Sequence, residues 1–190
     1  MNHRTRNLIA FVVLAAGFPT PGHAEPSVTQ KVDRELAGWM IGNFTLSDLH
    51  GNTITQEDLK DRWTFLLLGD TQCKQECLSA LTALTGMRKR IASTEVVKIT
   101  QVLFVSIDAQ RDTPERLHRY LAPFDPQFIG TMANRVNLSR LLEDLAASDT
   151  PPGAGSLWLI GPDRYLRGEF LPPYDIARLT EKFLKIRIGR

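Results

Sequence analysis

Cys73 and Cys77 are the only cysteines of this 190-residue chain, and four positions separate them. They follow an apolar run at 65–68 and a short turn at 69–72, at a point where a helix is expected to begin. On a helix, residues i and i+4 share a face, so both sulfur atoms would project from the same side. Thiolates placed in this way can exchange disulfides or bind a soft metal ion such as Cu(I).

Thiol exchange at this pair would follow a fixed order of attack. A helix N-terminus lowers the pKa of a cysteine placed on it, because the thiolate accepts unpaired amide donors and feels the helix dipole. Cys73 is nearest that end and is the expected attacking thiol, with Cys77 as the resolving thiol. One helical turn separates their Cα atoms by about 6 Å, near the long end of disulfide geometry, so a bridge is expected to be labile. Such a short loop restrains the unfolded chain little, which favours a functional pair over a structural one.

Strands and helices alternate around the cysteines in a pattern typical of a layered α/β domain. The segments 65–68 and 101–107 are expected to be strands covered on both faces of a sheet. A hairpin with strands at 44–46 and 53–55 precedes them. The other expected elements are a helix from Cys73 to 91, helices at 114–121, 136–147 and 175–188, a short strand at 128–130, and a closing hairpin of 157–160 and 165–170.

This order predicts a thioredoxin-like three-layer α/β/α fold with an N-terminal β-hairpin. The cysteines would then lie at the carboxyl end of a central strand, where open α/β sheets bind their ligands. Helical spacing predicts that Leu78 and Val136 face the core. Asp112 or Thr113 is expected to cap a helix with Pro114 in its first turn, which is a structural role.

Residues 1–24 have the features of a secretory signal peptide. Arg4 and Arg6 form a charged start, 8–18 is an apolar core, and 22–24 offers small residues for cleavage. The apolar core is short for a membrane span, so contact with a membrane is expected only if this segment stays uncleaved. The protein is therefore expected to be exported, and to be periplasmic if it comes from a Gram-negative bacterium.

The mature chain is expected to comprise a flexible segment at 25–42 and a thioredoxin-like domain at 43–190. The 23 lysines and arginines outnumber the 21 acidic residues by two, and Arg4 and Arg6 lie in the leader, so the mature formal charge is zero. Nucleic acid is an unexpected partner for a chain without a basic excess.

Four stretches of the chain resemble one family of thioredoxin-fold proteins. They are 44–51, the strand and C-x-x-x-C at 66–77, the segment VSIDAQRDTPE at 105–115, and 159–163. The third stretch is similar to the V-S-x-D-P-x-R-D-T-P-E signature of the Sco/SenC family, which helps to deliver copper to the binuclear copper centre of cytochrome c oxidase. The resemblance implies that Cys73 and Cys77 are metal ligands. It also implies a copper-enzyme subunit, or the cysteine pair of that subunit, as partner.

The chain departs from the family pattern at the site itself. Family members follow each cysteine with proline, whereas Lys74 and Leu78 stand here. The resemblance implies a histidine as third copper ligand, and that position falls at Gly153. His50 and His118 are the histidines that remain after the leader, and both are expected on the surface. Only an incomplete Cu(I) site of two thiolates is therefore expected, with much reduced affinity for Cu(II).

These observations leave three hypotheses. The pair could carry out thiol–disulfide exchange with a partner, or it could handle Cu(I) during assembly of a copper-containing respiratory oxidase. Ordinary thioredoxins place a cis-proline beside their cysteines, and that register falls near Gly155, so the redox hypothesis lacks one family feature. The third hypothesis is a binding or scaffold protein that kept the fold and lost both activities.

Overall fold

A single mixed sheet forms the centre of the computed structural model, which describes residues 34–35, 39–146 and 152–189. Its strand order is β1-β8-β7-β4-β5-β6-β2-β3. β4 pairs in parallel with β5, and β5 with β6, whereas the other pairs are antiparallel. The strands are β1 (Arg34–Glu35), β2 (Thr45–Asp48), β3 (Thr53–Thr55), β4 (Trp63–Gly69), β5 (Thr100–Ser106), β6 (Ile129–Met132), β7 (Leu157–Ile160) and β8 (Leu166–Phe170).

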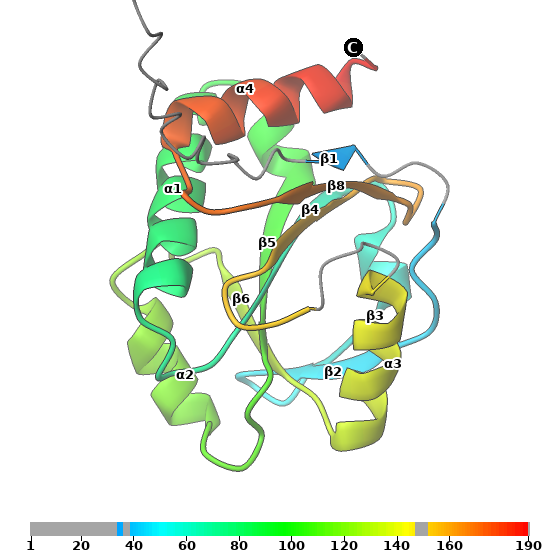
Figure 1. Cartoon of the computed structure of the whole chain (residues 1–190), viewed down its shortest axis with the longest axis vertical. Helices are drawn as coiled ribbons and strands as arrows, with labels where there is room; N and C mark the ends of the chain where they lie inside the picture. Colours follow the sequence, from blue (N-terminus) through cyan, green and yellow to red (C-terminus); the bar gives the residue numbers. More distant parts are fainter. Residues whose placement is uncertain (1–33, 36–38, 147–151, 190) are drawn as a thin grey trace, which may run out of the picture. The chain divides into compact units, whose positions relative to one another are not determined.

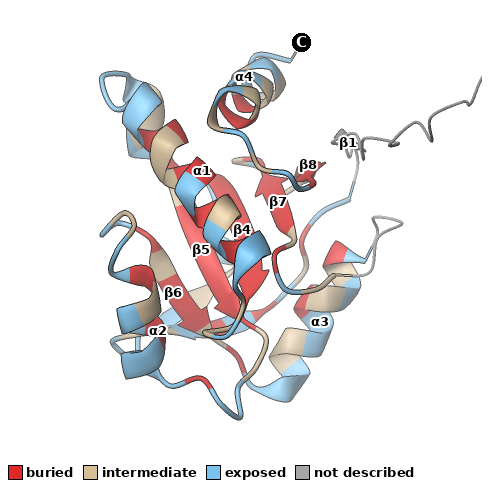
Figure 2. Ribbon diagram, turned by 60° about the vertical axis from the view of Figure 1, so that its left-hand side comes forward, coloured by how far each residue is buried: buried red, intermediate tan, exposed pale blue. Residues whose placement is uncertain are grey.

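Helices cover both faces of this sheet (Figures 1 and 2). Successive residues of β4 lie on opposite faces of the sheet, because side chains alternate along a strand. Phe65 and Leu67 pack with α1, α2 and α4, whereas Leu66 and Leu68 pack with α3. The predicted three-layer fold with its N-terminal hairpin is thus confirmed. The helices are α1 (Gln75–Ile91), α2 (Pro114–Leu121), α3 (Arg135–Leu145) and α4 (Ile176–Arg187), with the short 3-10 helices η1 (Gln56–Leu59) and η2 (Glu95–Ile99).

The helix starts follow from local hydrogen bonding. Thr113 accepts from the Arg116 amide and Pro114 opens α2, as expected for this turn. Asn134 caps α3 and Asp175 caps α4 in the same way. Each cap satisfies an amide that would otherwise lack a partner at the first turn, so these boundaries follow largely from sequence.

Two predicted core positions are wrong. Leu78 on α1 is 42% exposed and Val136 on α3 is 60% exposed. Both lie in the first turn of their helix; the buried residue in that turn of α1 is Cys77, and the first buried residue of α3 is Leu141. Spacing alone extended the buried stripe too far toward the helix starts.

The predicted signal peptide, 1–24, lies outside the described residues, as does most of the predicted flexible segment, 25–42. Within that segment β1 pairs with β8, and Ile41 is fully buried. The packed domain therefore begins before residue 43. No helix in the described part of the chain is long and apolar enough to cross a bilayer.

Candidate functional site

Cys73 and Cys77 lie just beyond the carboxyl end of β4, which is flanked by β5 and β7 in the sheet. They form a disulfide with a Cα–Cα separation of 5.7 Å. The structure thus brings the two predicted residues together at the predicted edge of the sheet. One detail differs: α1 begins at Gln75, with Lys74 in the N-cap position, so Cys73 lies in the preceding turn rather than on the helix.

The two sulfur atoms differ in their access to solvent. Cys77 is fully buried, and its Sγ lies 3.8 Å from the carbonyl oxygen of Leu68. Cys73 is partly exposed. An incoming thiolate can therefore reach Cys73, and the buried Cys77 sulfur is then the leaving group. The division between an attacking Cys73 and a resolving Cys77 stays a prediction, and this asymmetry is compatible with it.

The turn that carries Cys73 is held by two aspartates. Asp70 accepts from the Gln72 amide through its side chain at 2.7 Å, and from the Cys73 amide through its carbonyl at 3.1 Å. Asp112, which is nearly buried, accepts from the Thr71 hydroxyl at 2.6 Å and from the hydroxyl of Ser106 at the end of β5. Asp112 thus joins the turn after β4 to the end of the neighbouring strand, which agrees with the structural role expected for this segment.

Tyr120 on α2 holds Cys73 from the other side. Its hydroxyl donates to the Cys73 carbonyl oxygen at 2.7 Å. Burial, together with the negative charges of Asp70 and Asp112, raises the pKa of Tyr120 to about 12, so the hydroxyl stays a protonated donor at neutral pH. Sequence reasoning missed Tyr120, which is 47 residues from Cys73. The only available signal was its place beside the buried Leu121 on an amphipathic helix.

The loop before β7 packs on the first turn of α1. The Gly155 amide donates to the Leu68 carbonyl oxygen at 2.8 Å, and the Leu68 amide donates to the Ser156 carbonyl oxygen at 3.0 Å. Gly155 has a φ of +87°, and a Cβ there would lie 2.4 Å from the Cβ of Glu76. Gly155 is therefore required both by the left-handed backbone and by the close approach of α1.

Gly153, where the resemblance implies a histidine, is sterically open. A Cβ at this position would meet nothing within 4 Å, and the backbone is outside the left-handed region. His50 and His118 are exposed and line a separate cavity of about 380 Å³, to which no cysteine contributes. Among the described residues, no three histidine, cysteine or acidic side chains are grouped closely enough to hold a metal ion. In the described part of the chain, the donors that the site offers to a soft ion are thus the two cysteine sulfur atoms, once they are reduced.

The match to a protein family covers this site. Residues 33–148 match the family model SCO1/SenC. The chain belongs to the SCO1/SenC family. A putative copper-binding protein of Stutzerimonas stutzeri is 30% identical over 149 residues, which cover 73% of this chain and 72% of that protein.

A second sequence relative and a solved structure are also similar to this chain. The mitochondrial protein SCO2 of Saccharomyces cerevisiae is 38% identical over 89 residues, which cover 47% of this chain and 29% of that protein. A crystal structure of yeast Sco1 with copper bound superposes with a TM-score of 0.69 at 21% identity, covering 80% of this chain and 95% of that one. This structural match shows a shared fold.

Replacement of Gly155 by alanine tests the packing of the loop on α1. Gly155→Ala should lower the free energy of unfolding by about 2–4 kcal/mol. Alanine is strained at the positive φ of this position, and its Cβ would collide with the Cβ of Glu76. Gly153→Ala is the matched control and should change it by less than about 0.5 kcal/mol. Urea unfolding of both variants measures the difference, and equal stabilities would contradict this account of the loop.

Removal of one hydroxyl tests Tyr120 as a positioning residue. Tyr120→Phe should lower the free energy of unfolding by about 1 kcal/mol and change the pH profile of Cys73 alkylation in the reduced protein, because the turn that presents the Cys73 sulfur loosens. The pH dependence of Cys73 alkylation measures the second effect, which a purely structural role would not change. Tyr165→Phe, on the β7–β8 hairpin, is the control. An unchanged profile in Tyr120→Phe would exclude the positioning role.

Proposed function

We propose that this protein is exported and exchanges disulfides through Cys73 and Cys77 during assembly of a copper-containing respiratory oxidase. The observation that carries the proposal is the pair itself, with one reachable sulfur and one buried sulfur beside the end of a central strand. Membership of the SCO1/SenC family supports the place in oxidase assembly. The leader at 1–24 supports export, into the periplasm if the organism is Gram-negative.

The exchange proceeds in two steps from the reduced protein. The Cys73 thiolate attacks one sulfur of a partner disulfide, so that a mixed disulfide forms and the other partner sulfur leaves as a thiolate. The Cys77 thiolate then attacks the Cys73 sulfur, which forms the intramolecular disulfide and releases the second partner thiolate. Two electrons pass to the partner, whose cysteine pair is left reduced and able to take up copper. A dithiol protein reverses these steps and reduces Cys73 and Cys77 again.

Cu(I) handling is the second candidate function, and copper would then be the cargo. The reduced thiols of Cys73 and Cys77 would hold the ion, since soft thiolates suit Cu(I). Gly153 supplies no side-chain donor, so this position offers no nitrogen that would favour Cu(II). The copper-binding relative and the copper-bound yeast structure support this candidate. The missing donor favours thiol exchange over a durable copper site.

Serine variants of the cysteines separate these functions. The reduced mature chain should exchange with glutathione disulfide, Cys73→Ser should not react, and Cys77→Ser should stop at the mixed disulfide because the resolving thiol is absent. Mass spectrometry of acid-quenched samples identifies each species. A Cu(I) titration of the reduced chain, with the double variant Cys73→Ser/Cys77→Ser as control, measures metal handling. Absence of both exchange and Cu(I) binding would leave the scaffold hypothesis.

Introducing a histidine at position 153 tests whether Gly153 is the cause of the low Cu(II) affinity that we expect. Gly153→His should tighten Cu(II) binding by at least about tenfold. Loss of a group that only hydrogen-bonds to a metal ligand already costs about tenfold in affinity, and a residue that binds the metal directly should contribute at least as much. Open space around Gly153 accommodates the imidazole. Val136→His, at an exposed position on α3, is the control for a histidine outside the site. Equal Cu(II) affinities in the two variants, measured by competition with a chelator, would refute this account.

A further inference from the structure

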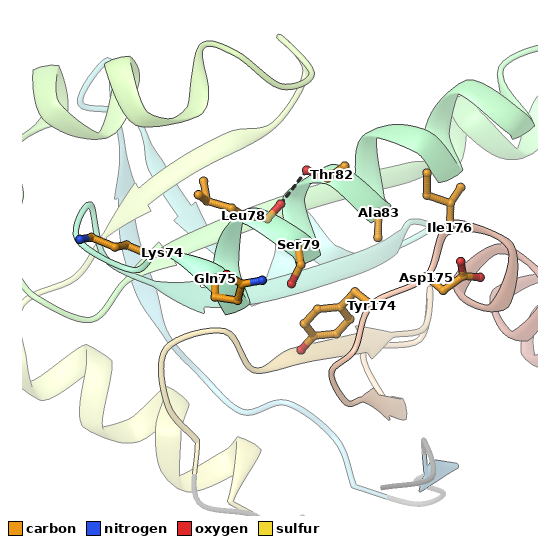
Figure 3. A pocket seen from close by; sticks show the side chains of 9 residues that line it. All are labelled: Lys74, Gln75, Leu78, Ser79, Thr82, Ala83, Tyr174, Asp175 and Ile176. Carbon is orange, nitrogen blue, oxygen red and sulfur yellow. Dashed lines mark hydrogen bonds between the residues drawn. The ribbon is translucent and has the colours of Figure 1, made fainter. Parts of the chain in front are cut away.

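A groove lies between α1 and residues 174–176 at the start of α4 (Figure 3). It has a volume of about 540 Å³. Lys74, the residue after Cys73, lies at one end, and Ile176 of α4 lies at the other (Figure 3). The groove therefore starts where a partner would be bonded to Cys73. It is lined by Lys74, Gln75, Leu78, Ser79, Thr82, Ala83, Tyr174, Asp175 and Ile176.

The lining has an apolar stretch and a cationic end. Leu78, Ala83 and Ile176 supply the apolar stretch, and Leu78 is 42% exposed, which leaves a large aliphatic side chain without full burial. Lys74 has no ion-pair partner among the described residues. Asp175, the one acidic residue of the lining, accepts from the Arg178 amide as the cap of α4. The lining therefore carries a cation beside Cys73 and a carboxylate at the far end, next to α4.

Two of the lining residues are also the positions where this chain departs from the family pattern. Lys74 and Leu78 each follow a cysteine, where the Sco/SenC pattern has proline. The two substitutions thus place a cation and an aliphatic side chain on one surface, one helical turn apart, which is about 5.4 Å along the axis. Both side chains lie on the surface next to the cysteine pair.

We propose that this groove binds the segment of the thiol partner that flanks its reactive cysteine, with an acidic residue beside Lys74 and an apolar residue over Leu78. The inference rests on the proposed thiol exchange and names the partner chemistry for that same site. A mixed disulfide at Cys73 forces the neighbouring partner residues onto the surrounding surface. An extended chain advances about 3.3 Å per residue, so residues two to four positions from the partner cysteine reach Leu78.

The test uses Cys77→Ser, which retains Cys73 alone, and nonapeptides with one central cysteine activated as its mixed disulfide with thionitrobenzoate. Attack by the Cys73 thiolate forms the protein–peptide disulfide and releases the coloured thionitrobenzoate anion, so absorbance measures the rate. One peptide carries glutamate beside the cysteine and leucine three residues away, on either side. Its comparison peptides carry lysine in place of the glutamate, serine in place of the leucine, or both replacements. Each rate is divided by the rate with Ellman's reagent, which reports the reactivity of Cys73 itself.

The glutamate–leucine peptide should react about tenfold faster than the lysine–serine peptide, through burial of the leucine and attraction to Lys74. Leu78→Ser should remove most of the preference for leucine, and Lys74→Glu should reverse the preference for glutamate. Val136→Ser, an exposed aliphatic position on α3, should change neither.

The outcomes separate the two proposals. Failure of Cys73 to react with Ellman's reagent or with glutathione disulfide would overturn the thiol exchange. Normal reactivity with those reagents, but equal rates for all peptides, would overturn the groove inference alone. Concentration-dependent dimers in sedimentation that Leu78→Ser abolishes would also overturn it, because a second copy of the chain would then occupy the groove.

Discussion

The site depends on the hydrogen bonds of Leu68 at the carboxyl end of β4. Leu68 uses both its amide and its carbonyl to bind the loop at 155–156, so the loop is fixed against the end of the central strand. The same carbonyl oxygen lies against the Cys77 sulfur. The first turn of α1 must then pass over this loop, and the absence of a side chain at Gly155 makes that approach possible. One sulfur is buried as a result, and the other is left in the turn at the surface.

The hydrogen bonds that hold the turn at Cys73 do not involve the Cys73 sulfur. Asp112 ties the turn to the end of β5, Asp70 closes the turn on itself, and Tyr120 anchors the Cys73 carbonyl. Each such hydrogen bond contributes about 1 kcal/mol net, so together they keep the turn in one conformation while the sulfur stays free to react. This arrangement suits a thiol that must form and break bonds with other proteins.

The features that were predictable from sequence are those with a local physical cause. The apolar run of β4, the caps at Thr113 and Asp175, and the clustering of both cysteines at one sheet edge follow from neighbouring residues. The helix start at Gln75 was not predicted, because Asp70 and Asp112 hold the turn through Cys73. Tyr120 and Gly155 reach the site from distant segments, and no spacing in the sequence reports such contacts. The exposure of Leu78 was also missed, because it depends on how far α4 extends over α1, and the sequence does not report this contact either.

The central claim is that Cys73 is the reachable sulfur and Cys77 the buried one. Limited alkylation of the reduced protein tests it directly, because trypsin cleaves after Lys74 and places the two cysteines on separate peptides. With substoichiometric iodoacetamide, mass spectrometry should find the label on the Cys73 peptide in roughly tenfold excess or more. Equal labelling of the two peptides, or a preference for Cys77, would contradict the account.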